Sequence, residues 1–113
     1  MGRVPTRISP HVDRYLRVCF AEGDVPRLEE LARRLRISRV TLGKRFREEA
    51  GISLGKYITA ARITCAKRLL TTTKLTMPTI ARRSAFGDER SFRRAFLRET
   101  KSTPAAYRRA HRV

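Results

Sequence analysis

Acidic residues are scarce in this chain. Its 113 residues include 10 Asp and Glu against 27 Lys and Arg, which gives a formal net charge of +17. No partner inside the chain neutralises that excess, so we expect a polyanion outside it, either nucleic acid or an anionic membrane surface. The alternative is a basic protein that is merely soluble and has no polyanionic partner.

Residues that carry catalytic or metal chemistry are also few. Tryptophan is absent, Cys19 and Cys65 are the only cysteines, and His11 and His111 lie near opposite ends. This spacing fits no metal site, and the apolar neighbours of each cysteine predict reduced core thiols rather than a disulfide. Paired catalytic carboxylates, a supported nucleophile–histidine set and a phosphate-cradling glycine loop are missing, so we expect neither an enzyme nor a cofactor.

Long hydrophobic runs are missing as well. No stretch approaches the roughly 20 apolar residues that a membrane span needs. The start, MGRVPTRISPHVDRYL, lacks the apolar centre of a signal peptide. We therefore expect a cytoplasmic protein with no membrane partner. An aromatic platform for stacking bases is absent too, which argues against the common RNA-binding modules.

One pattern occurs twice along the chain. LARRLRI (31–37) aligns with IARRSAF (80–86) at an offset of 49 residues, and SRVTLGKRF (38–46) aligns with DERSFRRAF (88–96) at an offset of 50. The extra residue between the two blocks is Gly87, and the match continues to Tyr57 and Tyr107. The sequence therefore predicts one helical unit present in two copies.

Capping residues and apolar periodicity place the helices. Ser9-Pro10 predicts a cap and a first helical residue, and EGDVP (22–26) ends that helix. Further helices are expected at 27–35, from Ser38 to about Ala50, from Ser53 to about Leu70, from Pro78, at 89–99 after Asp88, and from Thr103-Pro104. The helix after Ser53 is apolar on two sides, so we expect it to pack against both units.

Each predicted unit is a short helix, a turn and a second capped helix, which is the outline of a helix-turn-helix. The second helix of each unit, here called the recognition helix, enters the major groove in such folds. At about 100° per residue, Leu42 and Phe46 face the core of the first unit, and Phe92 and Phe96 that of the second. The opposite faces hold Val40, Gly43, Lys44 and Arg47, and Arg90, Arg93, Arg94 and Leu97. The alternative is a solvated charged face.

These residues resemble the AraC/XylS-type DNA-binding domain of bacterial transcription regulators. The resemblance covers about residues 8–110, and its most specific motifs are "IA", "FGD", the spaced "SF–R–F" and the ending "STPAAYR". It implies an all-α fold of about seven helices, in which two helix-turn-helix units are joined by a long central helix. The implied partner is double-stranded DNA, with both recognition helices in successive major grooves of one face.

The resemblance and the helical faces give the candidate site residues. The base-reading set is Val40, Thr41, Gly43, Lys44, Arg47, Glu89, Arg90, Ser91, Arg93 and Arg94, and the phosphate set is Arg33, Arg34, Arg39, Arg82 and Arg83. Glu89 could accept from cytosine N4 or simply favour the helix N-terminus. Gly43 could allow close approach of DNA, or reflect sequence drift.

Some positions depart from the family pattern. Ala85 and Lys101 stand where the family usually has Gly, and each costs about 1 kcal/mol if the backbone there is left-handed. Arg45 stands where the family is usually apolar, and Gly43 leaves the first recognition helix without a long side chain. We therefore expect the second unit to dominate sequence choice.

The expected organisation is one domain over residues 1–113. Its first unit covers about 8–51, the linker helix about 53–71 and the second unit about 77–110. We expect a sequence-specific, monomeric transcription regulator, or the DNA-binding portion of a larger one, with RNA polymerase as a further candidate partner. The alternative is a non-specific architectural nucleic-acid-binding protein.

Overall fold

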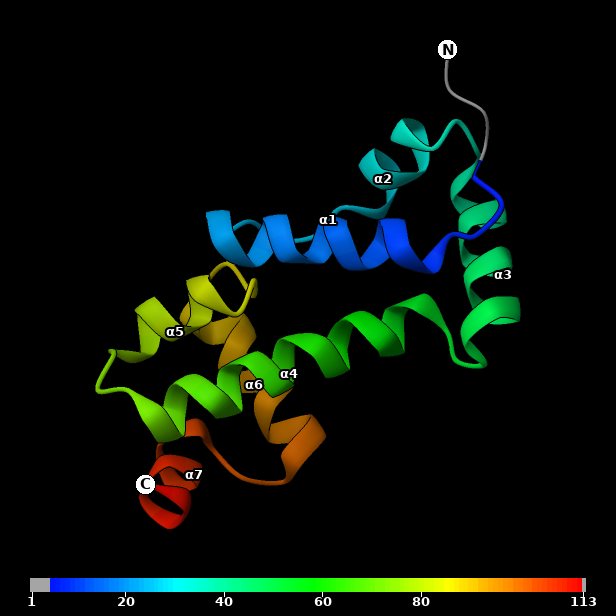
Figure 1. Ribbon diagram of the computed structural model, residues 1–113. Helices are drawn as coiled ribbons and strands as arrows, with labels where there is room; N and C mark the ends of the chain where they lie inside the picture. The colour runs from blue at the N-terminus through cyan, green and yellow to red at the C-terminus, as the bar shows by residue number, and fades with distance from the viewer. Residues whose placement is uncertain (1–4, 113) are drawn as a thin grey trace.

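The computed structural model describes residues 5–112, which form seven α-helices and no strand. The predicted all-α class is therefore confirmed for that part of the chain, while the expected domain limits at residues 1 and 113 lie outside it. The molecule is elongated, with extents of 48 × 26 × 23 Å (Figure 1). The helices are α1 (Ser9–Glu22), α2 (Leu28–Arg34), α3 (Arg39–Ala50), α4 (Leu54–Thr72), α5 (Met77–Arg83), α6 (Glu89–Thr100) and α7 (Pro104–His111).

Side-chain caps fix most of the helix starts. In each case the oxygen of a short polar side chain accepts from the backbone N–H three residues later, which satisfies one otherwise unpaired donor. The predicted caps at Ser38, Ser53, Asp88 and Thr103 are confirmed, and Thr76 caps α5 in the same way. The Thr76 cap was not predicted, because the sequence placed the start of this helix at Pro78, which is the second residue of α5.

The predicted cap at Ser9 is wrong. Ser9 is already the first helical residue, and Ile8 before it has no side chain that can accept a hydrogen bond. The missing acceptor comes from α3 instead, since the Glu49 carboxylate accepts from the backbone N–H groups of Ile8 and Ser9 and from the Ser9 hydroxyl. A residue 40 positions away thus caps α1.

The core is divided into two clusters of buried side chains. The first gathers residues of α1, α2, α3 and the start of α4, up to Ile58. The second begins at Ile63 and gathers the rest of α4 with α5 and α6, against which Tyr107 of α7 packs. The prediction that the helix after Ser53 packs against both units is therefore confirmed, although Ala61 and Cys65 on its apolar sides are only half-buried.

The two halves also touch away from α4, which the sequence did not predict. A Cβ built on Gly23 would lie 2.7 Å from Cγ of Arg82, and one on Gly87 would lie 2.8 Å from Cγ2 of Val25. Both glycines have positive φ, 73° and 89°. The turn after α1 and α5 therefore lie side by side, as in Figure 1, and only glycine fits at these two crossings.

Three non-glycine residues adopt the left-handed conformation. Ala85 and Lys101, the positions where the family usually has Gly, both have a φ of 63°. Arg36 has a φ of 61°. Arg36 aligns with Ala85 at the repeat offset of 49 residues, so each helix-turn-helix has a residue in the left-handed conformation at the same position of its turn. The departure at Arg45 also has an explanation, since its guanidinium donates to the backbone carbonyls of Pro5 and Thr6.

Candidate nucleic-acid interface

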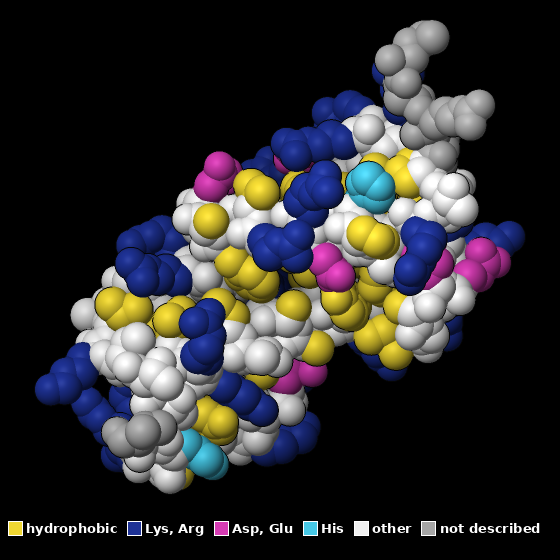
Figure 2. All heavy atoms as spheres, in the orientation of Figure 1, with side chains coloured by type: hydrophobic (Ala, Val, Ile, Leu, Met, Phe, Trp, Pro, Cys, Tyr) yellow, Lys and Arg dark blue, Asp and Glu magenta, His cyan; other side chains and the backbone are white. Residues whose placement is uncertain are grey.

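Positive charge covers the molecule along its whole length. Figure 2 shows Lys and Arg side chains over both halves of the face in view, with few Asp and Glu between them. Among residues 5–112 the ion pairs are limited to Arg34–Glu30, Arg39–Glu29, Arg93–Glu89 and Arg98–Glu99. Most of the cations therefore have no internal counter-charge, and a polyanionic partner can neutralise them.

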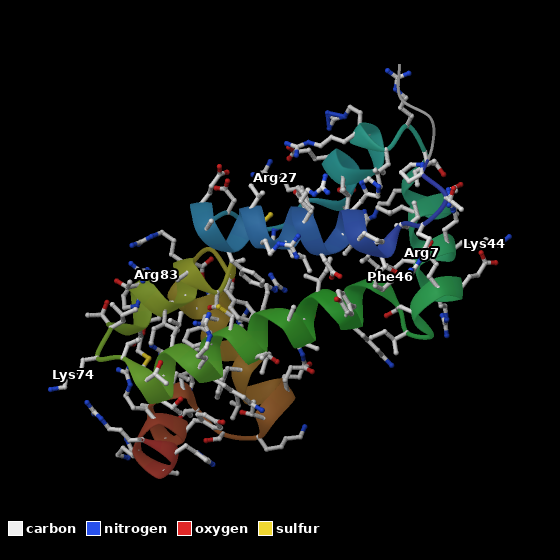
Figure 3. All side chains as sticks on the ribbon, viewed as in Figure 1. Arg7, Arg27, Lys44, Phe46, Lys74 and Arg83 are labelled. Carbon is white, nitrogen blue, oxygen red and sulfur yellow. The ribbon has the colours of Figure 1, made fainter. Side chains whose placement is uncertain are left out.

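The outer face of α3 presents unpaired cations. Leu42 and Phe46 are fully buried, whereas Lys44 and Arg47 are exposed and take part in none of the ion pairs in the described chain. Figure 3 shows Lys44 pointing away from the molecule and Phe46 pointing into it. Val40, with 81% of its surface exposed, lies on the same outer side and adds an apolar side chain to it.

Thr41 is held by contacts within this helix, whereas Gly43 is not constrained by its surroundings. Thr41 is half-buried, its N–H donates to the Ser38 hydroxyl oxygen, and its own hydroxyl accepts from Ser38. The Thr41 hydroxyl is thus engaged in the helix cap. A Cβ added to Gly43 would meet no atom within 4 Å, so nothing inside the protein requires glycine there.

The outer face of α6 carries arginines. Phe92 and Phe96 are fully buried, whereas Arg90 and Arg94 on the opposite side are exposed and have no carboxylate partner within residues 5–112. Leu97 extends the same face with 47% of its surface exposed. The fork of an arginine side chain matches the O6 and N7 acceptors of guanine, so Arg90 and Arg94 are suited to reading bases.

Glu89, Ser91 and Arg93 are occupied by contacts within α6. Glu89 forms an ion pair with Arg93 one turn later. The Ser91 hydroxyl donates to Asp88 at 3.0 Å, and the Ser91 N–H donates to the same carboxylate at 2.7 Å. These N–H and hydroxyl donors hold the pKa of Asp88 below its usual range. The pairing of Glu89 is a third role for this residue, beyond the two that the sequence suggested.

The predicted phosphate contacts divide into two kinds. Arg33 and Arg83 are exposed and unpaired among the described residues, whereas Arg34 pairs with Glu30 and Arg39 with Glu29, both at 2.6 Å. The side-chain stem of Arg82 lies against Gly23 at the crossing of the two halves. All five are exposed at the surface, and Arg33, Arg82 and Arg83 take part in none of the ion pairs within residues 5–112.

Sequence reasoning missed Arg62 of α4. Its Nη1 donates to the Ala85 carbonyl at 3.2 Å, and its guanidinium lies over the Phe86 ring at 4.5 Å from the centroid. Burial lowers the pKa of Arg62, and the nearby Arg98 lowers it further. Arg62 therefore holds the turn that precedes α6, and the signal for it was a lone arginine between apolar positions of a buried helix.

Cysteine and acidic groups show no metal chemistry in the described chain. No group of three or more His, Cys, Asp or Glu between residues 5 and 112 is arranged to hold a metal ion. Cys19 is buried and Cys65 half-buried, and both are free thiols. In the same range, no helix has the length and apolarity that crossing a membrane requires.

A family model described as a helix-turn-helix domain matches residues 31–110, which include both α3 and α6. The chain belongs to the AraC-type helix-turn-helix family. This family consists of DNA-binding transcription regulators and is not an enzyme class. The matched residues take in the whole of the predicted repeat, so the resemblance inferred from the motifs is confirmed.

Two curated relatives of this AraC-type chain are regulators. It is 35% identical over 88 residues to the transcriptional regulator Rv1931c of Mycobacterium tuberculosis, a match that covers 78% of this chain and 34% of that one. It is 38% identical over 88 residues to the ornithine utilization regulator of Pseudomonas aeruginosa, covering 78% and 26% respectively. The chain thus spans about a third or less of the length of these relatives.

Solved structures of AraC-type domains match nearly the whole chain. The C-terminal domain of AraT, a response regulator from Geobacillus stearothermophilus, superposes with a TM-score of 0.84 at 28% identity, covering 99% of this chain and 91% of that one. The DNA-binding domain of AdpA, solved in complex with a target DNA, gives a TM-score of 0.80 at 30% identity and covers 94% and 93%.

Proposed function

We propose that this chain binds duplex DNA sequence-specifically, with α3 and α6 in successive major grooves, as the DNA-binding portion of a transcription regulator. The observation that carries the proposal is the pair of equivalent outer faces. Lys44 and Arg47 on α3, and Arg90 and Arg94 on α6, are exposed, basic and free of internal carboxylate partners in the described chain. Membership of the AraC-type family supports the same partner.

The dimensions of the molecule fit this arrangement. The 19 residues of α4 rise about 28 Å in all, and the molecule is 48 Å long. Successive major grooves on one face of B-DNA lie about 34 Å apart. A rigid α4 fixes the separation of α3 and α6. Where that separation differs from the groove spacing of straight DNA, bending of the duplex brings the second groove to its helix.

The contacts divide by role. For base reading we retain Val40, Thr41, Gly43, Lys44, Arg47, Glu89, Arg90, Ser91, Arg93 and Arg94, with Arg90 and Arg94 as the chief specifying side chains. For phosphates we retain Arg33, Arg34, Arg39, Arg82 and Arg83. Phosphate contacts supply affinity that falls steeply with salt, and base contacts supply the choice of sequence.

The proposed organisation is one domain with units at about 8–51 and 77–110 around the linker helix at about 53–71. It binds DNA as a monomer in the cytoplasm, at the nucleoid. Surfaces away from α3 and α6 remain free for RNA polymerase. The molar ratio at saturation of a single selected duplex tests the stoichiometry, and a ratio of two chains to one site contradicts it.

Selection of bound duplexes from a random library, at about 0.15 M salt, tests the function. Two enriched blocks about one helical turn apart support reading by both units. One enriched block means that a single unit specifies the sequence. Tight binding without enrichment favours the rival function, a non-specific architectural protein, which the spread of positive charge over both halves would also suit.

A further inference from the structure

The repeat places two equivalent surface hollows beside the recognition helices. The first lies between α3 and the start of α4, and Leu28, Gly43 and Gly55 are among its lining residues. The second lies between α6 and the start of α7, and is lined at the corresponding positions by Met77, Arg93 and Ala105. These pairs follow the repeat offsets of 49 and 50 residues, so the two hollows are the same feature of the fold.

The two hollows differ in charge. In the first, Arg39, Lys44 and Arg47 line the hollow, and no carboxylate is among its lining residues. Arg39 pairs with Glu29 of α2, but both side chains stay about three-fifths exposed, at 60% and 65%. Lys44 and Arg47 have no ion pair in the described chain. The first hollow therefore presents a net positive surface.

The second hollow contains both an acid and a base. Glu89 stands at the position that Arg39 occupies in the first unit, and Arg93 stands at that of Gly43. These two side chains form an ion pair with each other. Glu89 offsets the charge of Arg93, and the arginine side chain stands at the position where the first unit has glycine.

Glycine at the first hollow has no explanation inside the protein. A Cβ added to Gly43 or to Gly55 would meet no atom within 4 Å. Neither residue is among those with positive φ. Gly43 lies in the interior of α3, where glycine is less stable than alanine. Two helices thus each omit a side chain at the same basic hollow.

We propose that the first hollow seats a phosphate of the DNA backbone, beside the α3 outer face. Gly43 and Gly55 let the backbone approach closely, and Arg39, Lys44 and Arg47 neutralise it. This inference rests on the proposed DNA binding and adds a contact to α4, at Gly55, that the recognition helices alone do not provide. It moves Gly43, Lys44 and Arg47 from the base-reading set to the backbone contacts, and it leaves most base reading to the second unit.

Gly43→Ala tests the seat because stability and binding should move in opposite directions. The added methyl group favours the helix and meets nothing in the protein, so the melting temperature rises by about 4 °C. The same methyl group intrudes on the phosphate, so affinity falls by about tenfold, which corresponds to one charge-assisted hydrogen bond. The loss should be equal for the selected duplex and for a scrambled one, because phosphates carry no sequence.

Controls and a second variant complete the experiment. Gly55→Ala should weaken binding in the same way, whereas Ala105→Gly, at the equivalent position of the second hollow, should leave affinity unchanged. The double change Arg39→Glu with Gly43→Arg builds the second hollow's pair into the first. It should make the dependence of log affinity on log salt shallower by about one unit or more.

The outcomes separate the seat from the proposed function. Unchanged affinity in Gly43→Ala, with the melting temperature raised, overturns the seat while DNA binding stands. A loss confined to substitutions at one base pair also overturns it, since Gly43 would then face a base. Failure of the unaltered chain to bind any duplex overturns the proposed function itself.

Discussion

The Glu49 carboxylate in α3 accepts a hydrogen bond from the backbone N–H of Ser9 in α1 at 2.9 Å. It also accepts from the N–H of Ile8 at 2.7 Å and from the Ser9 hydroxyl at 2.9 Å. One acidic side chain thereby supplies the cap that the sequence around α1 lacks. It also ties the first recognition helix to α1, so the position of α3 depends on it.

Replacing Glu49 by Gln should destabilise the fold by about 1 kcal/mol, the usual loss for a helix cap. Burial raises the pKa of Glu49, but the N–H groups of Ser9 and Ile8 outweigh it and hold the pKa below its usual range. The lowered pKa means that Glu49 stabilises the protein above the ordinary carboxyl pKa and loses that effect as pH falls through the folded value.

Urea unfolding at neutral and acid pH checks this prediction. The difference in unfolding free energy between the unaltered chain and Glu49→Gln should shrink as pH falls. Glu48→Gln is the matched control, because Glu48 is exposed and has no ion pair among residues 5–112. An equal loss in both variants would count against the cap.

Gly51 and Lys101 occupy equivalent helix ends at the repeat offset of 50 and have φ values of 80° and 63°. Lys101→Gly should raise the unfolding free energy by about 1 kcal/mol, because a side chain costs that much in the left-handed conformation. Gly51→Lys should lower it by a similar amount. Thermal unfolding of the two single variants measures both effects, and a shift of the same sign in both contradicts the argument.

Arg62→Ala should destabilise the protein by about 2 kcal/mol, since it leaves the Ala85 carbonyl without its donor and uncovers the Phe86 ring. Arg62→Lys keeps the charge but not the planar guanidinium, so it should recover only part of the loss. Chemical unfolding is the measurement. Arg68→Ala on the exposed side of α4 is the control, and a full rescue by lysine would show that charge alone matters.

Arg94→Ala should reduce discrimination between the selected duplex and a single-mismatch duplex by about tenfold or more, because a bidentate contact to guanine is lost. Lys44→Ala should weaken binding to both duplexes by similar factors. Competition binding at fixed salt distinguishes the two effects. A larger loss of discrimination from Lys44→Ala would defeat the idea that the second unit dominates sequence choice.

The sequence predicted those features that depend on neighbouring residues. Caps at Ser38, Ser53, Asp88 and Thr103 follow from local chemistry, and the buried faces of α3 and α6 follow from helical periodicity. The left-handed backbone at Ala85 was expected from the family pattern. The repeat aligns Arg36 with Ala85 and so indicates the same conformation at Arg36, but the left-handed conformation was expected only at Ala85.

The features that were missed depend on residues far apart in the chain. Three contacts each join segments far apart in the chain: the Glu49 cap of α1, the contact of Arg82 with Gly23, and the hydrogen bond from Arg62 to the Ala85 carbonyl. Periodicity shows which face of a helix is buried but not which neighbour lies against it. The pairing of Glu89 with Arg93 is local but was still missed. An acid at a helix start can favour the helix N-terminus, contact cytosine or pair with a base one turn later, and the sequence does not choose among these roles.

The continuity of α4 has a consequence for the spacing of the DNA site. Ile58 belongs to the first core and Ile63 to the second, so the helix between them sets the angle between the halves together with the crossings at Gly23 and Gly87, which an insertion in α4 would separate. Each residue inserted there would rotate α6 by about 100° and advance it by about 1.5 Å relative to α3. Seven inserted residues, close to two full turns, nearly restore the angle. If α3 and α6 both read DNA as proposed, we expect the preferred half-site spacing to follow the rotation of α6 about α4, so it should change in steps of whole helical turns.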